Sequence, residues 1–121
     1  MVAVVHAAGL SGIDGYIVTV EGMLSGGLPR MDIVGLPDKA VSESAERVRG
    51  ALKQLGYDWP VSRLTINLAP ADTRKEGPVY DLAIALAILA VTGQINALPE
   101  KAVFLGELSL TGEIRPICGA L

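Results

Sequence analysis

The sequence predicts one α+β domain of two layers, in which helices cover a sheet. Its 121 residues fit a single compact domain, and 50% of them are apolar, so a core is available. Turn residues divide the chain into segments in the order β-β-β-α-β-α-β-β. Strands and helices in this mixed order are typical of an α+β fold.

The N-terminal part predicts three strands. Residues 1–8 form an apolar run ended by Gly9 and Gly12, and residues 16–24 alternate between two faces. The turn residues at 26–29 precede a third predicted strand at residues 31–34. Such short connections favour an antiparallel meander.

The next segment predicts a helix whose N-cap is Asp38, directly after Pro37. Gly56 lies where a helix-ending glycine is common. Glu43 and Arg47, four residues apart, are interpreted as a weakly attractive pair on a solvated face. The apolar positions recur at spacings of four and three and therefore share one stripe: Val41, Ala45, Val48, Leu52 and Leu55.

The second half predicts a strand, a buried helix and two more strands. Residues 63–68 alternate strictly, so every second residue faces the core. Residues 82–92 are apolar on all sides, which predicts a covered helix that Asp81 opens and Gly93 ends. Residues 102–108 predict a strand, and residues 110–114 a tight reversal into a last strand near residues 115–118.

Composition excludes several classes of protein. The net charge of −3 gives no overall attraction to nucleic acid or anionic lipid, and five aromatic residues are too few for a base-stacking platform. The longest apolar run has ten residues, against the roughly 20 that a bilayer requires. No phosphate-binding glycine motif and no cluster of metal ligands is present. A soluble cytoplasmic domain without a cofactor or metal of its own is expected.

The lone His6 and Cys118 fit structural roles better than catalytic ones. His6 lies in the first predicted strand, where an imidazole packed in the sheet or at its edge is expected. Cys118 has no neighbour that would lower its pKa, so a small core residue is expected rather than a nucleophile.

The loop between the strand at residues 63–68 and the buried helix is the candidate functional segment. A rigid strand end and a helix N-terminus flank it, which suits contact with a partner or an anion. In the alternative interpretation Asp81 caps the helix, Gly77-Pro78 makes the turn and the charges are merely solvated. The candidate interaction residues are Asp72, Arg74, Lys75, Glu76, Gly77, Pro78 and Asp81.

Several motifs in order resemble the N-terminal domain of the magnesium-chelatase-like AAA+ proteins, the ComM (YifB) family. The resemblance covers essentially the whole chain. It rests on Gly12-Ile13-Asp14-Gly15, Gly27-Leu28-Pro29, Ile33-Val34-Gly35-Leu36-Pro37-Asp38, Glu46-Arg47-Val48-Arg49, Asn67-Leu68-Ala69-Pro70-Ala71-Asp72, Lys75-Glu76-Gly77-Pro78 and Asp81-Leu82.

The resemblance implies a ribosomal protein S5 domain 2-like fold, a mixed sheet with two main helices, shared with the Lon proteolytic domain. It implies that residues 1–121 are one N-terminal domain of a longer chain that continues into an AAA+ ATPase module. The complete protein then resembles a homo-hexameric motor for DNA branch migration during natural transformation, using ATP and magnesium downstream of this domain. Its partners would be its own ATPase module, neighbouring subunits and DNA, and no membrane.

The same resemblance bears on catalysis. In Lon-type peptidases a serine follows the Gly-Pro of this loop, and a lysine after the last strand acts as its base. Here Val79 follows Pro78, and members of the family commonly carry Ser-Phe where this chain has Val79-Tyr80. A non-catalytic accessory domain is therefore expected.

Three alternatives stay open at this point. One is a Lon-type serine peptidase, which Val79 disfavours. Another is a module that binds phosphate or single-stranded nucleic acid weakly through Arg74 and Lys75. The third is a literal magnesium chelatase, which the missing metal-ligand cluster disfavours.

Overall fold

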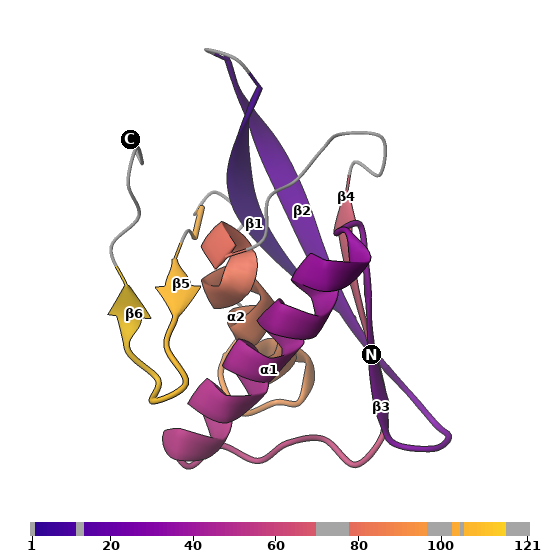
Figure 1. Cartoon of the computed structure of the whole chain (residues 1–121). Coiled ribbons are helices and arrows are strands. Elements are labelled where there is room, and N and C mark those ends of the chain that lie inside the picture. Colours follow the sequence, from indigo (N-terminus) through magenta and orange to yellow (C-terminus); the bar gives the residue numbers. More distant parts are fainter. Residues whose placement is uncertain (1, 12–13, 70–77, 97–102, 105, 116–121) are drawn as a thin grey trace.

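The chain folds as an α+β domain with a four-stranded mixed sheet and two helices, as predicted (Figure 1). The computed structural model describes residues 2–11, 14–69, 78–96, 103–104 and 106–115. The elements are β1 (Val2–Ser11), β2 (Asp14–Ser25), β3 (Arg30–Val34), α1 (Asp38–Gln54), β4 (Arg63–Ala69), the 3-10 helix η1 (Pro78–Tyr80), α2 (Asp81–Val91), β5 (Glu107–Leu108) and β6 (Ile114–Arg115).

The strand order of the main sheet is β1-β2-β4-β3. β1 pairs antiparallel with β2, and β2 antiparallel with β4, whereas β3 pairs parallel with β4. The predicted antiparallel meander of the first three strands is therefore wrong. The 17 residues of α1 supply the long crossover that two parallel strands need, and this crossover lets β4 lie between β2 and β3.

The register places apolar residues of neighbouring strands in rows on one face. Val5 lies opposite Val20, which lies opposite Leu68, and all three are buried. Ile33 lies opposite Ile66 in the parallel pair and is also buried. The alternation predicted for residues 63–68 is confirmed, because every second residue of β4 faces this core.

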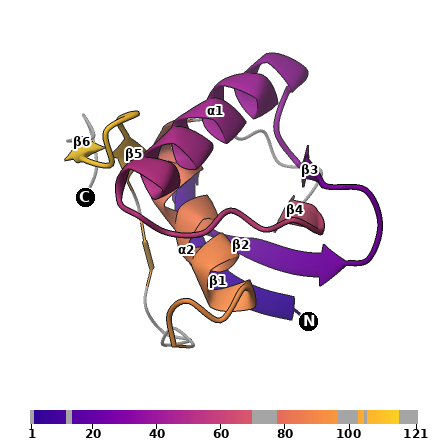
Figure 2. The same cartoon turned by 90° about the horizontal axis from the view of Figure 1, so that it is seen from below.

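Both helices cover the same side of the sheet (Figure 2). α2 packs on β1 and β2, and α1 packs on α2, β3 and β5. A Cβ atom at Gly22 in β2 would lie 3.3 Å from the carbonyl oxygen of Ala87, so this glycine lets α2 approach the sheet closely. The prediction of a covered second helix is confirmed, since eight of its residues are buried.

The predicted stripe of α1 is confirmed along most of its length. Val48 and Leu52 are buried, and Val41 and Ala45 pack half-buried against the core. Leu55 at the end of the stripe is 56% exposed, because the helix ends at Gln54 and the chain turns there. Gly56 follows with a φ of +86°, as expected for a helix-ending glycine.

Some predicted boundaries are wrong. β1 continues to Ser11, so Gly9 does not end it. Pro37 is the N-cap of α1 and Asp38 its first residue. Of the described residues in the strand predicted at 102–108, residues 107 and 108 form β5, and Val103 makes a single parallel bridge with His6.

The final reversal is confirmed by the pairing of β5 with β6. Of the last strand, predicted near residues 115–118, residue 115 lies in β6 and the others lie outside the described residues. Within the described parts of the chain, neither helix is long and apolar enough to span a bilayer.

Candidate functional site

The predicted interaction loop falls mostly outside the residues that the structure describes. Asp72, Arg74, Lys75, Glu76 and Gly77 belong to that part of the chain, so their role stays a prediction. The two remaining candidates are placed: Pro78 is the first residue of η1, and Asp81 is the first residue of α2.

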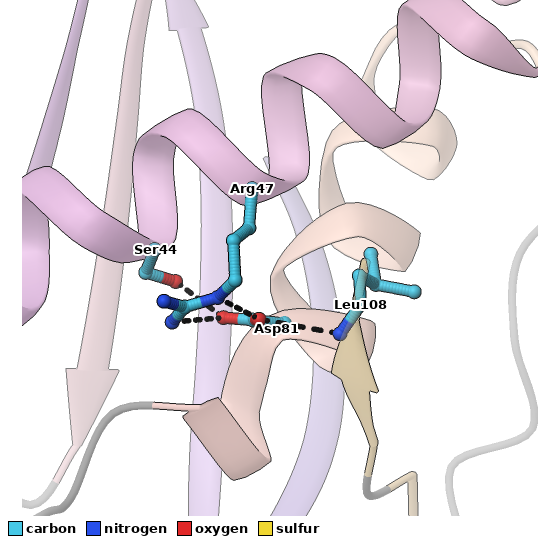
Figure 3. Close-up of polar contacts among 4 residues, drawn as sticks. All are labelled: Ser44, Arg47, Asp81 and Leu108. Atoms are coloured by element: carbon cyan, nitrogen blue, oxygen red, sulfur yellow. Dashed lines mark hydrogen bonds and ion pairs between the residues drawn. The ribbon is translucent and has the colours of Figure 1, made fainter. Parts of the chain in front are cut away.

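Asp81 is fully buried and lies where α1, α2 and β5 meet (Figure 3). Its Oδ1 accepts hydrogen bonds from Ser44 Oγ at 2.7 Å and from Arg47 Nη2 at 3.2 Å. Its Oδ2 accepts from Arg47 Nε at 2.6 Å and from the backbone N–H of Leu108 at 3.3 Å. The carboxylate therefore joins both helices to the small second sheet.

The electrostatics of this contact favour a permanent structural pair. Two nitrogens of the Arg47 guanidinium meet the two carboxylate oxygens of Asp81, a fork geometry that is stronger and more directional than a single contact. The side chain of Arg47 is 19% exposed and that of Asp81 is not exposed at all. A charge buried this deeply is tolerated only with such partners.

The structure corrects the interpretation of Arg47 as part of a solvated face. Arg47 turns toward α2 and pairs with a carboxylate 34 residues later in the chain. The i to i+4 rule considers only partners on the same helix and therefore misses this one. A usable signal was present, since a carboxylate that opens an otherwise apolar helix needs a cation or several donors once that helix is buried.

Asp81 lies in the first turn of α2 but does not cap the helix. The N-cap of α2 is Tyr80, and no side chain makes a capping hydrogen bond there. Instead, the first turn is held by backbone contacts: the N–H of Leu82 donates to Gly106 O at 3.0 Å, and the N–H of Gly106 donates to Val79 O at 3.1 Å. The start of α2 is thus bound to residue 106 on one side and to α1 on the other.

The Ser44 hydroxyl contacts the Asp81 carboxylate but is not an accessible nucleophile. Ser44 lies in the middle of α1, is fully buried and donates to Asp81, which already accepts two contacts from Arg47. A buried hydroxyl that donates to a carboxylate already held by a guanidinium cannot meet a polypeptide substrate. Val79, which follows Pro78, packs half-buried against the core.

The remaining candidates for chemistry are sparse within the described residues. His6 lies in β1, its backbone oxygen accepts from Phe104 N at 2.9 Å, and its buried Nδ1 has no hydrogen-bond partner in the described part of the chain. No three histidine, cysteine, aspartate or glutamate side chains gather there as metal ligands. Cys118 lies outside the described residues.

Comparison with known proteins places these features in a family. The family model for subunit ChlI of Mg-chelatase matches residues 20–121. Protein YifB of Salmonella typhimurium is 46% identical over 120 residues, covering 98% of this chain and 24% of that protein. Competence protein ComM of Haemophilus influenzae is 43% identical over the same shares of the two chains. The chain thus spans about a quarter of the length of these relatives.

A weaker similarity reaches the Lon proteases. Lon protease of Rhizobium meliloti is 28% identical over 125 residues, which cover 98% of this chain and 15% of the protease. The ChlI match covers far more than half of the chain, and the YifB and ComM relatives align along nearly all of it. The chain therefore belongs to the Mg-chelatase ChlI family, as a ComM/YifB-like N-terminal domain.

Proposed function

We propose that this chain is a non-catalytic accessory domain of a magnesium-chelatase-like AAA+ ATPase. In this role it helps the ring of ATPase modules to assemble, or it guides DNA toward the ring during branch migration in natural transformation. Membership of the ChlI family supports the link to such an ATPase, and the name of the Haemophilus influenzae relative, a competence protein, supports the link to transformation.

The observation that carries the non-catalytic role is the side chain of Val79. Lon protease of Rhizobium meliloti is similar to this domain. The resemblance described above implies a serine at this position in Lon-type peptidases, whereas an isopropyl group cannot attack a carbonyl carbon. Val79 packs against the core, and the nearby Asp81 is occupied by Ser44, Arg47 and the N–H of Leu108. These groups bind the elements of the domain to one another, and neither Val79 nor the buried Ser44–Asp81 contact offers an accessible pair of nucleophile and base.

The proposal extends to the complete protein. We infer that the fold is ribosomal protein S5 domain 2-like, which the mixed four-stranded sheet, the two helices and the Lon similarity support. In this proposal the chain continues into the ATPase module, which binds ATP and magnesium, forms a homo-hexamer and works in the cytoplasm. This domain supplies no cofactor or metal site of its own.

The decisive experiment compares the complete protein with a version that lacks residues 1–121. Sedimentation with a non-hydrolysable ATP analogue measures ring formation, and a fluorescent branched DNA measures the rate of branch migration. The proposal expects the shortened protein to form fewer rings or to migrate branches several-fold more slowly. Equal ring formation together with an equal rate would show that the domain is dispensable for both and would overturn the proposal.

A second experiment tests the predicted interaction loop. The double variant Arg74→Ala, Lys75→Ala is compared with Lys39→Ala, which removes an exposed lysine from α1. The loop variant is expected to slow branch migration while the control does not. If DNA itself is the loop's partner, amide shifts of residues 73–77 on adding a short DNA strand should fade steeply with salt. If these shifts are absent, or do not change with salt, direct contact between DNA and this loop is excluded.

The peptidase alternative is tested with a fluorophosphonate probe and an unfolded protein substrate. No serine is expected to be labelled and no cleavage is expected. Covalent labelling of any serine would contradict the non-catalytic proposal.

A further inference from the structure

The free edge of the main sheet lies along β3. β3 is the last strand in the order β1-β2-β4-β3, and β4 is its one neighbour among the described strands. Among the described residues, no backbone hydrogen bond reaches residues 30–34 from the other side. With respect to the described residues, this edge therefore presents N–H and C=O groups without a ladder partner, which form a ready template for one more strand.

A hollow of about 570 Å³ follows this edge, and we call it the β3 groove. It is lined by all five residues of β3, by Val41 and Ser42 of α1, and by Arg63 and Thr65 of β4. A second hollow of about 600 Å³ continues from Arg30 and Met31 along α1 to Trp59. The groove is long enough for an extended segment that matches the five residues of β3.

The two sides of the β3 groove differ in chemistry because side chains alternate along a strand. On the helix-covered side, Ile33 is buried and Met31 and Val41 are half-buried, which gives an apolar wall. On the opposite face, Arg30 and Arg63 have side chains that are 64% and 51% exposed. An added strand would therefore place every second residue against aliphatic groups and the others beside guanidinium groups.

The charge of this region favours an acidic occupant. The two hollows are lined by four basic side chains and two acidic ones, whereas the whole chain has a net charge of −3. Asp32 balances part of this charge, since it accepts from Arg30 at 2.8 Å and from Arg63 at 3.4 Å. One acid between two guanidiniums leaves donors free for carboxylates on an incoming strand.

We propose that the β3 groove binds an extended acidic peptide segment by strand addition, with alternating carboxylate and aliphatic side chains. Backbone hydrogen bonds to β3 supply affinity, and the apolar wall and the two arginines supply selectivity. This inference goes beyond the accessory role proposed above, because it requires neither an ATPase ring nor DNA.

Two other occupants fit less well. A nucleic acid strand has no peptide N–H and C=O groups to complete a ladder with β3, and the Trp59 ring already has the Arg49 guanidinium over it, 5.6 Å from its centroid. A second copy of the chain, pairing β3 with β3, would bring two positively charged edges together.

The test titrates the 121-residue chain with an acetylated, amidated six-residue peptide of alternating glutamate and valine. Amide shifts and hydrogen exchange at residues 30–34 report the site. Saturable binding is expected, with the largest shifts in β3 and slower exchange of its outward N–H groups. Two control peptides replace the glutamates by lysines, or carry N-methyl groups on alternate residues so that they cannot complete a ladder. Both are expected to bind at least tenfold more weakly.

Protein variants distinguish binding in the β3 groove from nonspecific charge attraction elsewhere on the protein. The double variant Arg30→Glu, Arg63→Glu is expected to weaken the acidic peptide at least tenfold, whereas Lys39→Glu on α1 reverses a charge outside the groove lining and should leave binding unchanged. If charge reversal lowers the melting temperature, Arg30→Gln with Arg63→Gln replaces it.

Four outcomes would overturn the proposal. The first is binding that survives loss of both arginines. The second is tighter binding of an eight-nucleotide thymidine strand than of the acidic peptide. The third is a shift of residues 30–34 with protein concentration alone, which would indicate self-pairing. The last is no binding of any peptide at millimolar concentration, which would mean that the arginines only keep sheet edges apart.

Discussion

The Arg47 guanidinium and the Asp81 carboxylate meet through two hydrogen bonds, of 2.6 and 3.2 Å, across the interface of the two helices. Asp81 is the residue that opens α2, and Arg47 lies near the middle of α1. The pair fixes the rotation of each helix relative to the other. It also requires both helices to be in place before either charge is satisfied, so we expect it to act as one unit in folding.

Replacing Asp81 by alanine is expected to destabilise the domain by about 3–5 kcal/mol, because the Arg47 charge, the Ser44 hydroxyl and the Leu108 N–H all lose their acceptor. Urea unfolding measures the loss. Glu43→Ala, which removes an exposed carboxylate from α1, serves as control and should change stability by less than about 0.5 kcal/mol.

The apolar double variant Arg47→Met, Asp81→Leu sharpens this test. Replacing both charges by apolar groups of similar size is commonly neutral or even stabilising by about 1–4 kcal/mol. The double variant should therefore be more stable than Asp81→Ala alone. Equal losses in the two proteins would show that the pair does not act as a unit.

The parts of the fold that the sequence predicted are those decided by local periodicity. The strict alternation in β4 and the all-apolar α2 each leave only one arrangement that buries their side chains, and both were predicted correctly. The length and stripe of α1 follow from the same reasoning. The local pattern of each element is therefore enough to identify it, without knowledge of which segments it packs against.

The sequence predictions are wrong where the partner of a strand or side chain lies in a distant segment of the chain. β3 follows β2 closely along the chain, yet it pairs with β4, whose sequence comes after α1. Arg47 has a carboxylate four residues before it but pairs with Asp81. In both cases the observed partner comes from a segment more than 25 residues away in the chain, and no local pattern carries that information. Five of the predicted interaction residues have no structural outcome, since residues 70–77 lie outside the described part of the chain, whereas Pro78 and Asp81 are placed at the start of η1 and of α2.

Gly35, directly after β3, is expected to tolerate no side chain. Its φ is +106°, and a Cβ atom there would lie 2.4 Å from the carbonyl oxygen of Leu68. Gly35→Ala therefore combines an unfavourable backbone conformation with overpacking, together about 2–4 kcal/mol. Thermal or urea unfolding measures the effect.

Gly27→Ala is the matched control for this position. Gly27 also has a positive φ, of +127°, but a Cβ atom at this residue would meet no described residue within 4 Å apart from its chain neighbours, so only the backbone cost of about 1–2 kcal/mol remains. Similar losses for the two variants would mean that contact with Leu68 does not limit the turn at Gly35.

Replacing one isoleucine on each face of the main sheet compares how much each face contributes to stability. Ile66 in β4 is fully buried under the helices, and Ile17 in β2 is 55% exposed. Ile66→Ala should cost about 2–5 kcal/mol through lost burial and a cavity. Ile17→Ala should change the free energy of unfolding by less than about 0.5 kcal/mol. A large loss of stability in Ile17→Ala would indicate that another copy of the chain covers the outer face in solution. The free energy of unfolding would then depend on protein concentration.

The last prediction concerns acid. The hydrogen bond from Arg30, reinforced by the charges of Arg30 and Arg63, holds the pKa of Asp32 below its ordinary value of 3.8. A carboxylate whose pKa is lower in the folded state stabilises the fold above its unfolded pKa, and that contribution is lost as pH falls through the folded pKa.

We therefore compare the unfolding free energies of the natural protein and of Asp32→Asn from pH 6 to pH 2, so that the other carboxylates cancel. The advantage of the natural protein should be constant above about pH 5, decline below pH 3.8 and vanish at the acid end. It should also shrink in high salt, because both arginines are exposed. Arg30→Gln should remove most of the same pH dependence, since Arg30 is the principal cause of the shift. An advantage that grows toward low pH would contradict the sign of the shift and hence the role of this ion pair at the β3 edge.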